Sequence, residues 1–282
     1  MRKRVVLAVL AIAWLFAPAS PARAQSSGGT DVPDRFLFEA GGFNMFVSTN
    51  MVFNSLTLGG TTVNFEKELN LPDSAQRGYV EGYWRLARRH QLSVSYSRLN
   101  RTGSGATLTH DINWGGSVFP AGVTAVGKMD SSFFSGSYRF AVYRGQKFEV
   151  GPSIGFGYLA LTAGIDATFS VAGPQGQAVS TTLSPENTEK TPTGDIGGYA
   201  NWWLSKRWYA RGDLRYIIVK PENTTASVTE GRGSLTWYPW THFGIGGQFG
   251  YTKFRFDRTV RSTSLGGNYR YDGVQLLGSL AF

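Results

Sequence analysis

Charged side chains recur at alternate positions in several short segments of this chain. Glu81 and Arg85 share one face of segment 77–88, and Arg211, Asp213 and Arg215 share one face of segment 207–219. Six acids and five arginines occupy positions of this kind: Glu39, Glu81, Arg85, Arg139, Glu149, Asp195, Arg211, Asp213, Arg215, Glu230 and Arg232. Charges kept from bulk water are stable only when paired. We expect either a structural plug of ion pairs or a polar path for water, ions or a small solute, and both would use the same residues.

The histidines offer a second chemistry. His90 and His242 lack a Ser and an acid at a spacing typical of a catalytic triad. His110 precedes Asp111 in a polar stretch, and Asp130 and Asp195 could reach the same rim, so these groups could activate a water molecule for hydrolysis. Their surroundings do not resemble a protease of this type, so the chain is predicted to be non-enzymatic. We expect no cofactor, no catalytic residue and no metal site.

The segments that carry these charges are predicted strands. Apolar and polar residues alternate with a period of two over about ten residues, and no long stretch shows helical periodicity. In segment 77–88, Val80, Gly82, Trp84 and Leu86 lie on the face opposite the charges. The fold class is therefore all-β.

Short and long connections alternate between the strands. Tight turns are predicted at 87–90, 143–147, 204–207 and 239–242, and long connections rich in Gly, Ser, Thr, Asn and Pro at 48–76, 102–131 and 161–194. This is typical of a closed antiparallel transmembrane β-barrel with short periplasmic turns and long extracellular loops. About ten strands are expected, at 35–47, 77–88, 90–101, 132–143, 146–160, 194–204, 207–219, 228–238, 242–257 and 267–282. Eight remains an alternative, and twelve would result if 61–66 and 105–110 also crossed.

The first residues predict export. Arg2, Lys3 and Arg4 precede an apolar run of about 12 residues, too short for a spanning helix, and Ala22 and Ala24 form a small-x-small cleavage site. The expected organisation is a cleaved signal peptide at 1–24, a short N-terminal segment at 25–34 and a barrel at 35–282. Cleavage lowers the net charge from +9 to 28 − 4 − 19 = +5, which does not indicate a nucleic-acid partner. The chain has no cysteine, so neither a disulfide nor a thiolate metal site is available.

Tryptophan placement gives independent support for a barrel. Six of the eight tryptophans lie beside the predicted short turns: Trp84, Trp202, Trp203, Trp208, Trp237 and Trp240. Aromatic side chains gather at membrane interfaces, so we expect these six to form a girdle at one interface.

The last strand has the expected lipid-facing pattern. Val274, Leu276, Leu280 and the terminal Phe282 share one face of it. This stretch resembles the signal by which the barrel-assembly machinery recognises outer-membrane proteins, which makes that machinery an expected partner during biogenesis.

Over nearly its whole predicted mature length, the chain resembles the small bacterial outer-membrane β-barrels of the OmpA-like and OmpW-like class. The segments ELNLPDSAQRGYVEGYWRLARRHQLSVSYSRLNRTGS, DINWGGSVFPAG and DSSFFSGSYRF also resemble a group of uncharacterised outer-membrane barrel proteins. The resemblance implies a monomeric protein of the Gram-negative outer membrane that contacts lipid and lipopolysaccharide. It carries no catalytic residue onto this chain.

The expected function is therefore a structural or surface-binding role through the extracellular loops. The main alternative is a narrow channel for small solutes or ions, and an outer-surface hydrolase is the least favoured.

Overall fold

A computed structural model describes residues 32–55, 59–172, 178–219, 224–260 and 263–282. The predicted signal peptide, including Ala22 and Ala24, lies outside these residues, as does 25–31 of the predicted N-terminal segment. Across the described residues, no helix is long and apolar enough to cross a membrane.

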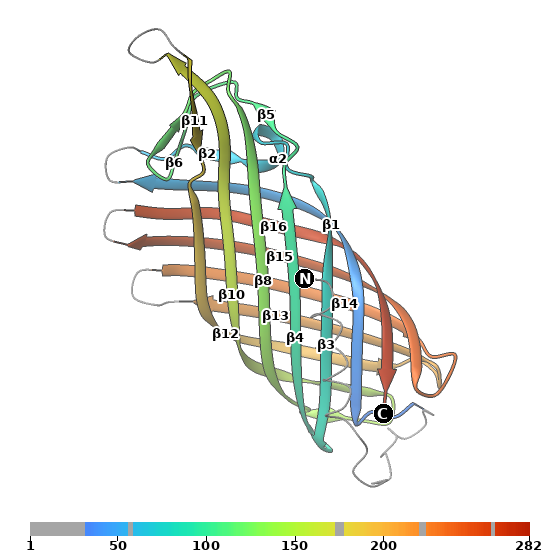
Figure 1. Cartoon of the computed structure of the whole chain (residues 1–282). Helices are drawn as coiled ribbons and strands as arrows, with labels where there is room; N and C mark the ends of the chain where they lie inside the picture. The colour runs from blue at the N-terminus through green and yellow to red at the C-terminus, as the bar shows by residue number, and fades with distance from the viewer. Residues whose placement is uncertain (1–31, 56–58, 173–177, 220–223, 261–262) are drawn as a thin grey trace.

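Ten long antiparallel strands form a closed barrel (Figure 1). They are β1 (Phe36–Ser55), β3 (Ser74–Ala87), β4 (His90–Thr102), β8 (Thr124–Phe140), β10 (Phe148–Ala172), β12 (Glu186–Trp203), β13 (Trp208–Val219), β14 (Thr224–Trp237), β15 (Phe243–Val260) and β16 (Thr263–Ala281). Each pairs with the next, and β16 pairs with β1 over 19 positions from Leu37–Ala281 to Ser55–Thr263. The barrel is closed, so no edge remains inside a bilayer.

The predicted count of about ten strands is confirmed. Each predicted segment overlaps one barrel strand. Segments 61–66 and 105–110 contain only the short strands β2 (Thr62–Asn64) and β5 (Ala106–Thr107), which pair with the outer parts of β1 and β8. Neither is long enough to span the membrane as a barrel strand, which excludes the twelve-strand alternative.

One end of the barrel, here called the turn end, carries the short connections. Residues 88–89 join β3 to β4, residues 204–207 join β12 to β13, and residues 238–242 join β14 to β15. The strand β9 (Tyr143–Arg144) lies in the turn before β10. The first and last strands meet here, because Phe36 and Phe282 exchange backbone hydrogen bonds of 2.8 and 2.7 Å.

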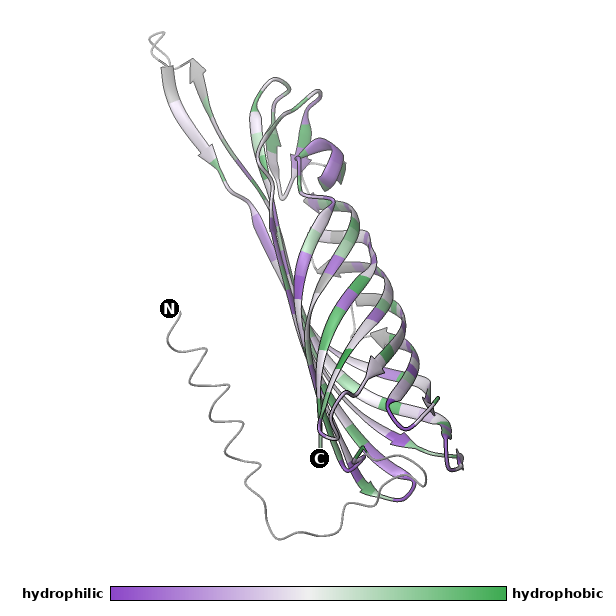
Figure 2. Cartoon of the chain, turned by 90° about the vertical axis from the view of Figure 1, so that its right-hand side faces the viewer, coloured by the Kyte–Doolittle hydropathy of each residue, from purple (hydrophilic) through white to green (hydrophobic). Residues whose placement is uncertain are grey.

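The opposite end, the loop end, has two distinct parts. The outer part of β10 and the strand β11 (Ala178–Leu183) form an arm that projects beyond the barrel (Figure 2). Beside it, the connections between β1 and β3 and between β4 and β8 fold over the mouth. They contain α2 (Phe65–Glu68), β6 (Ile112–Trp114) and β7 (Ser117–Phe119). Asn64 caps α2 by accepting a hydrogen bond of 2.9 Å from the Lys67 backbone amide.

Within the wall, period-two alternation separates an apolar outer face from an inner face that is mostly polar near the turn end. On β10, Ile154 and Phe156 are 61% and 66% exposed on the outside, while Glu149 and Ser153 are buried inside. Some inward positions require glycine: a Cβ on Gly151 would lie 1.8 Å from the Phe140 carbonyl oxygen of β8. The missing side chain allows the two strands to approach closely there.

Five of the six predicted girdle tryptophans lie on the outer surface at the turn end: Trp84, Trp202, Trp208, Trp237 and Trp240. The prediction for Trp203 was wrong. Its side chain is 8% exposed and packs inside the barrel, with its ring centroid 4.5 Å from that of Tyr209. Adjacent strand residues point to opposite faces, so Trp202 and Trp203 cannot both face lipid.

Candidate functional site

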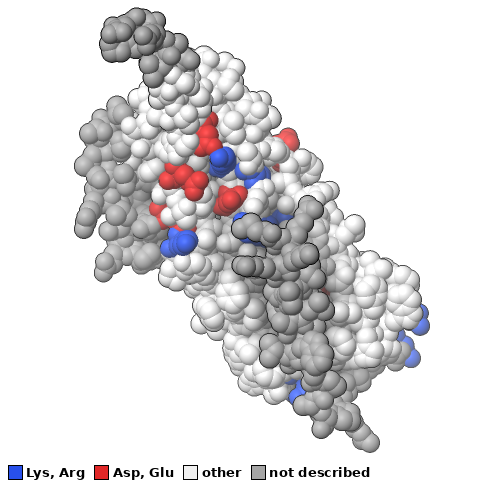
Figure 3. Space-filling model, in the orientation of Figure 1, with Lys and Arg blue, Asp and Glu red and all other residues white. Residues whose placement is uncertain are grey.

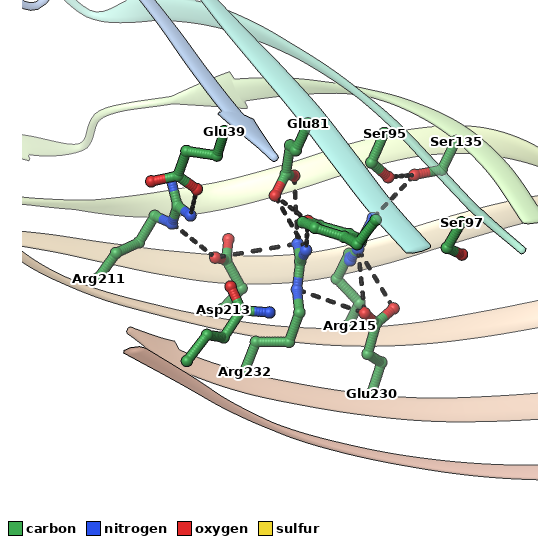
Figure 4. A network of polar contacts seen from close by, with 12 residues as sticks. Glu39, Glu81, Ser95, Ser97, Ser135, Arg211, Asp213, Arg215, Glu230 and Arg232 are labelled. Carbon is green, nitrogen blue, oxygen red and sulfur yellow. Dashed lines mark hydrogen bonds and ion pairs between the residues drawn. The ribbon is translucent and has the colours of Figure 1, made fainter. Parts of the chain in front are cut away.

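The structure places all eleven predicted charged residues on the inner face of the barrel. They lie on seven of the ten strands, and the most exposed of their side chains in an ion pair, that of Glu230, is 13% exposed. We call those that join into one network in the middle of the barrel the ion-pair layer: Glu39, Glu81, Arg139, Arg211, Asp213, Arg215, Glu230 and Arg232 (Figure 4).

Asp213 is the central acceptor of this layer. Arg139 on β8 pairs with one of its carboxylate oxygens. The other oxygen lies 3.5 Å from Nε of Arg211 and 4.0 Å from Nη2 of Arg232. Arg211 also pairs with Glu39 of β1, and Glu39 is fully buried. Strands β1, β8, β13 and β14 are therefore connected across the lumen.

A second limb continues from Arg232. Its Nη1 lies 3.0 Å from Glu81 Oε2 on β3, and its Nε lies 3.3 Å from Glu230 Oε1. Glu230 also contacts Arg215 at 3.2 Å, and Arg215 donates a 3.1 Å hydrogen bond to the Ser135 hydroxyl on the opposite wall. The small side chain of Ser135 leaves room for a long arginine from across a narrow lumen.

Tyrosine rings hold neighbouring arginines of like charge. The guanidinium carbons of Arg139 and Arg211 lie 4.8 and 4.4 Å from the Tyr83 ring centroid. Tyr199 faces Arg139 at 4.7 Å, and Tyr79 faces Arg232 at 5.6 Å. The attraction between a cation and an aromatic face adds to the carboxylate pairing. These tyrosines share alternating faces with the predicted charges, so the sequence pattern could have identified them.

A separate cluster closes the turn end. Arg85 bridges Asp34 at 3.1 Å and Glu149 at 3.0 Å, and Arg144 contacts the same two carboxylates at 2.5 and 3.3 Å. Tyr199 donates a 2.9 Å hydrogen bond to Glu149. Burial raises the pKa of the Asp34 carboxyl above its usual value, opposed by the charges of Arg85 and Arg144. Asp34 and Arg144 lie outside the alternating segments, so the pattern gave no signal for them.

Asp195 stands apart from both clusters. It is 3% exposed, and no basic side chain of the described residues lies within 4.0 Å of its carboxylate. It lies across β10 from Ser137, because Gly155 pairs with Asp195 on one side and with Ser137 on the other.

The inner face changes character toward the loop end. Residues of the covering connections and of the wall form a buried apolar cluster, which we call the apolar cap: Met45, Val47, Met51, Val63, Phe65, Leu69, Leu71, Leu99, Leu108, Ile112, Trp114, Phe119, Ala125, Met129, Leu161, Ala163, Ile165, Ala167, Ile217, Val228, Phe254 and Tyr269. Trp114 is fully buried, with its ring 5.5 Å from Phe65 and 5.8 Å from Phe53. The connections thus fill the mouth with a core like that of a soluble domain.

Arg101 ties the apolar cap to the wall. Its guanidinium contacts Glu66 of α2 at 2.7 Å and donates hydrogen bonds to the Pro72 carbonyl at 3.1 Å and to the Thr49 hydroxyl at 2.6 Å. Sequence reasoning missed this pair. Arg101 shares the inner face of β4 with Ser93 and Ser95, so alternation could have found it. Glu66 lies in a connection without a strand pattern, and nothing local marked it.

The four residues considered for hydrolysis do not come together. His110 Nε2 lies 3.3 Å from Glu68, and Asp111 accepts a 2.8 Å hydrogen bond from the Ala121 amide. Asp130 is exposed on the outer face of β8, whereas Asp195 lies inside the barrel. In the part of the chain that the structure describes, no three His, Cys, Asp or Glu residues are arranged to hold a metal ion.

Comparisons with known proteins find likeness only at the level of solved structures. No family model matches the chain, and no curated protein matches its sequence. The translocator domain of the autotransporter NalP from Neisseria meningitidis is 10% identical, with a TM-score of 0.40 and 88% of this chain and 89% of that chain covered. OprG from Pseudomonas aeruginosa is 9% identical, with a TM-score of 0.37 and 91% and 99% covered. Ail, the attachment invasion locus protein of Yersinia pestis, is 8% identical, with a TM-score of 0.32 and 87% and 97% covered.

The outer surface of the barrel itself identifies its surroundings. The predicted assembly-signal residues Val274, Leu276, Leu280 and Phe282 are 39–74% exposed on the outside of β16. Large apolar side chains are also exposed on the other strands, and the tryptophan girdle borders them at the turn end. A closed barrel with an apolar exterior, a polar inner layer and an aromatic girdle is suited to a bilayer that proteins cross with strands. The chain is a small ten-stranded β-barrel of the Gram-negative outer membrane.

Proposed function

We propose that this barrel is non-enzymatic and closed to solutes, and that it acts at the outer surface in a structural or binding role through its loop end. The observation that carries this proposal is the filling of the lumen by two layers in series. A solute that entered from outside would meet the apolar cap first and the ion-pair layer next.

The ion-pair layer opposes passage because its charges are already satisfied by one another. Asp213 has three arginines within 4.0 Å, and Glu230 has two. An ion that displaced one partner would leave another charge buried and uncompensated, which typically costs about 3–5 kcal/mol.

The apolar cap opposes passage for a different reason. Its largest members, including Trp114, Phe65 and Phe119, are fully buried and offer no ligands to replace the water shell of an ion. Arg101 and Glu66 hold the connection that contains α2 against β1 and β4.

Single-channel recording in a planar bilayer tests closure, after a heat-modifiable gel shift has shown folding. Four chains are compared: the unaltered protein, one with residues 108–122 replaced by a short Gly-Ser linker, one carrying Arg139→Ala and Asp213→Ala, and one with both changes. We expect steady discrete steps only from the last, because each layer alone blocks the lumen. Steps from the folded unaltered protein would contradict the proposal.

The projecting arm is the candidate binding element of the loop end. One threonine pair crosses its two strands, at 3.1 Å between Thr168 and Thr182, and a second joins β10 to β12 at its base, at 2.9 Å between Thr162 and Thr188. Charged residues of both signs gather on the face near its base, where Lys128 pairs with Asp166 (Figure 3). Hydroxyl and charged groups on a rigid sheet suit recognition of a polar surface.

The arm can be shortened without disturbing the cap. Phe169 and Thr181 lie directly opposite each other, so replacing residues 170–180 with Asn-Gly would close a two-residue hairpin. We expect the shortened chain to fold as the full chain does but to lose binding on an array of glycans and extracellular matrix proteins. Equal signals from both chains would exclude the arm as the binding element.

A narrow channel is the second candidate, favoured by the polar wall around Asp195. The buried hydroxyl of Thr193 lies two residues before it on β12, and that of Ser137 lies across β10 from it. Asp195 has no paired cation among the described residues. Reproducible steps from the unaltered protein that change with Arg211→Ala or Arg215→Ala would support this function.

The expected partners in biogenesis belong to the same proposal. The outward row Val274, Leu276, Leu280 and Phe282 on the closing strand supports recognition by the barrel-assembly machinery. The apolar exterior supports contact with outer-membrane lipid and lipopolysaccharide, as a monomer.

A further inference from the structure

Exposed positive charge gathers at the turn end. Six basic residues lie in the turns or directly before strands at this end, and we call them the cationic collar: Arg35, Arg88, Arg89, Lys147, Lys206 and Arg207. All six are exposed. Among the residues that the structure describes, no carboxylate side chain lies within 4.0 Å of any of their charged groups.

The acids of the turn end do not neutralise the collar. Asp34 and Glu149 both form ion pairs with Arg85 and Arg144 inside the barrel at the turn end. The exposed turns that the structure describes at this end contain no Asp or Glu. The collar is therefore a surface of one sign.

The loop end differs in charge. There, acids lie among the exposed basic residues, and two pairs form ion pairs: Lys128 with Asp166 and Arg270 with Asp272. In Figure 3 red and blue residues adjoin near the loop end, whereas the opposite end shows blue alone. The net positive charge of the chain thus lies mainly at the turn end, whereas charges of the two signs nearly balance at the loop end.

The collar lies at the depth of lipid headgroups. Arg207 directly precedes Trp208, and Lys147 directly precedes Phe148, both exposed members of the aromatic border. Arg35 precedes Phe36, whose ring stacks on Trp84 with centroids 5.8 Å apart. Consecutive strand residues are separated by about 3.3 Å, so these charges lie within one or two residues of side chains that prefer the membrane interface.

The collar is interrupted on one side of the barrel. Its members flank the strands from β1 through β3, β4, β8, β10 and β12 to β13. The turn between β14 and β15 carries Trp240 and His242 but no Lys or Arg. The positive charge is therefore unevenly distributed around the turn end, and is absent from the turn between β14 and β15.

We propose that the cationic collar binds the phosphate groups of anionic phospholipids in the leaflet at the turn end, which is the periplasmic leaflet. Guanidinium and ammonium groups donate charge-assisted hydrogen bonds to phosphate. Each basic residue near an anionic membrane surface strengthens the attraction by up to about fivefold. The turns are short, so their charges remain among the headgroups and do not reach a partner deeper in the periplasm.

The tryptophan girdle reports on this leaflet directly. The five exposed tryptophans lie at the turn end, whereas Trp114 and Trp203 are buried. The full mature chain is reconstituted into vesicles containing either brominated phosphatidylglycerol or brominated phosphatidylcholine, and quenching of its fluorescence gives the relative binding constant of the two lipids. We expect a several-fold preference for phosphatidylglycerol that weakens as salt is raised.

The decisive variant combines Arg88→Gln, Arg89→Gln, Lys206→Gln and Arg207→Gln. The hydrogen bonds made by this part of the chain use main-chain carbonyls, such as that of Arg207 with the Tyr238 amide, so folding should persist. We expect the relative binding constant to fall several-fold toward 1, since each cation contributes separately and only Arg35 and Lys147 of the collar remain. An unchanged preference in this variant, or no preference in the unaltered chain, overturns the proposal.

A matched control removes the same charge from the loop end, through Arg98→Gln, Lys190→Gln, Lys253→Gln and Arg255→Gln. This variant should quench as the unaltered chain does; an equal loss in both variants would assign the effect to net charge and overturn the proposal. Two competitors separate the possible sources of the ligand. Loss of the preference on adding inorganic phosphate at matched ionic strength would indicate a site for free phosphate, and loss on adding soluble peptidoglycan fragments would indicate a cell-wall partner.

Discussion

The ion-pair layer and the apolar cap fill the same lumen by opposite means. On β1, buried Glu39 lies in the ion-pair layer, and six residues further along the same inner face Met45 begins the apolar cap. On β13 the change occurs between Arg215 and Ile217. In the ion-pair layer, long side chains of the barrel strands themselves fill the lumen. In the apolar cap, the connections between strands fold back and fill the loop end of the lumen.

The difference teaches where each layer obtains its stability. At the depth of the ion-pair layer the inner faces of the strands meet only one another, so charges from opposite walls satisfy one another. Above the lipid, connections of 18 to 21 residues are free to fold inward and bury apolar area as a soluble core does. The ion-pair layer should therefore be sensitive to charge balance, and the apolar cap to volume.

The largest effect is expected from breaking one buried pair. Glu39→Ala leaves Arg211 with Asp213, at 3.5 Å, as its one carboxylate partner among the described residues, and should lower the free energy of unfolding by about 3–5 kcal/mol. Guanidinium titration of the heat-modifiable gel shift measures this. The double variant Glu39→Met, Arg211→Met removes both charges and should recover most of the loss. A double variant as unstable as the sum of its single changes would show that packing, and not charge balance, sustains this layer.

The two layers also differ in how far the sequence could predict them. Alternation identified all ten strands and placed the eleven charges, because inside a bilayer each position has only lipid or lumen to face. The same parity rule could have assigned Trp203 to the interior. Alternation made two strands too short at their outer ends: β8 begins at Thr124 and not near 132, and β10 ends at Ala172 and not near 160. Above the membrane both faces of a strand can be polar, so the pattern fades.

The apolar cap could not have been predicted from local sequence. Phe65, Leu69, Leu108 and Trp114 are scattered among polar residues, without the period of a strand or of a long helix. Their burial comes from contacts between two connections far apart in the chain and the walls of β1 and β10. Asp34 and Arg144 were missed for the same reason, since only the closed barrel brings them to Arg85 and Glu149.

In the apolar cap, a change of similar size should destabilise only the connections, so its effect on the whole barrel is smaller. Trp114→Ala should remove about 3–5 kcal/mol of packing, since it empties a fully buried site between Phe65 and Phe53. The loss should fall on the cap, because the barrel strands keep their own hydrogen bonds. Hydrogen exchange at residues 103–123 should accelerate while the guanidinium midpoint of the barrel changes little. Val118→Ala, in the same connection but 39% exposed, is the matched control and should leave exchange nearly unchanged. A large fall in the midpoint with Trp114→Ala would mean that cap and barrel unfold as one unit.

The smallest effect should come from an ion pair that belongs to neither layer. Arg270 and Asp272 lie on the outer face of β16, 3.2 Å apart, with side chains 58% and 32% exposed. Arg270→Gln removes a charge that water already solvates, so the free energy of unfolding should change by no more than about 1 kcal/mol. Titration of both variants with urea, which adds no ions, at low and high salt measures this against Glu39→Ala. Salt should reduce the small effect of Arg270→Gln further but leave that of Glu39→Ala largely intact, because ions in solution do not screen a pair buried in the lumen. If salt reduced both equally, water and ions would reach the ion-pair layer, and the lumen would be more open than its packing indicates.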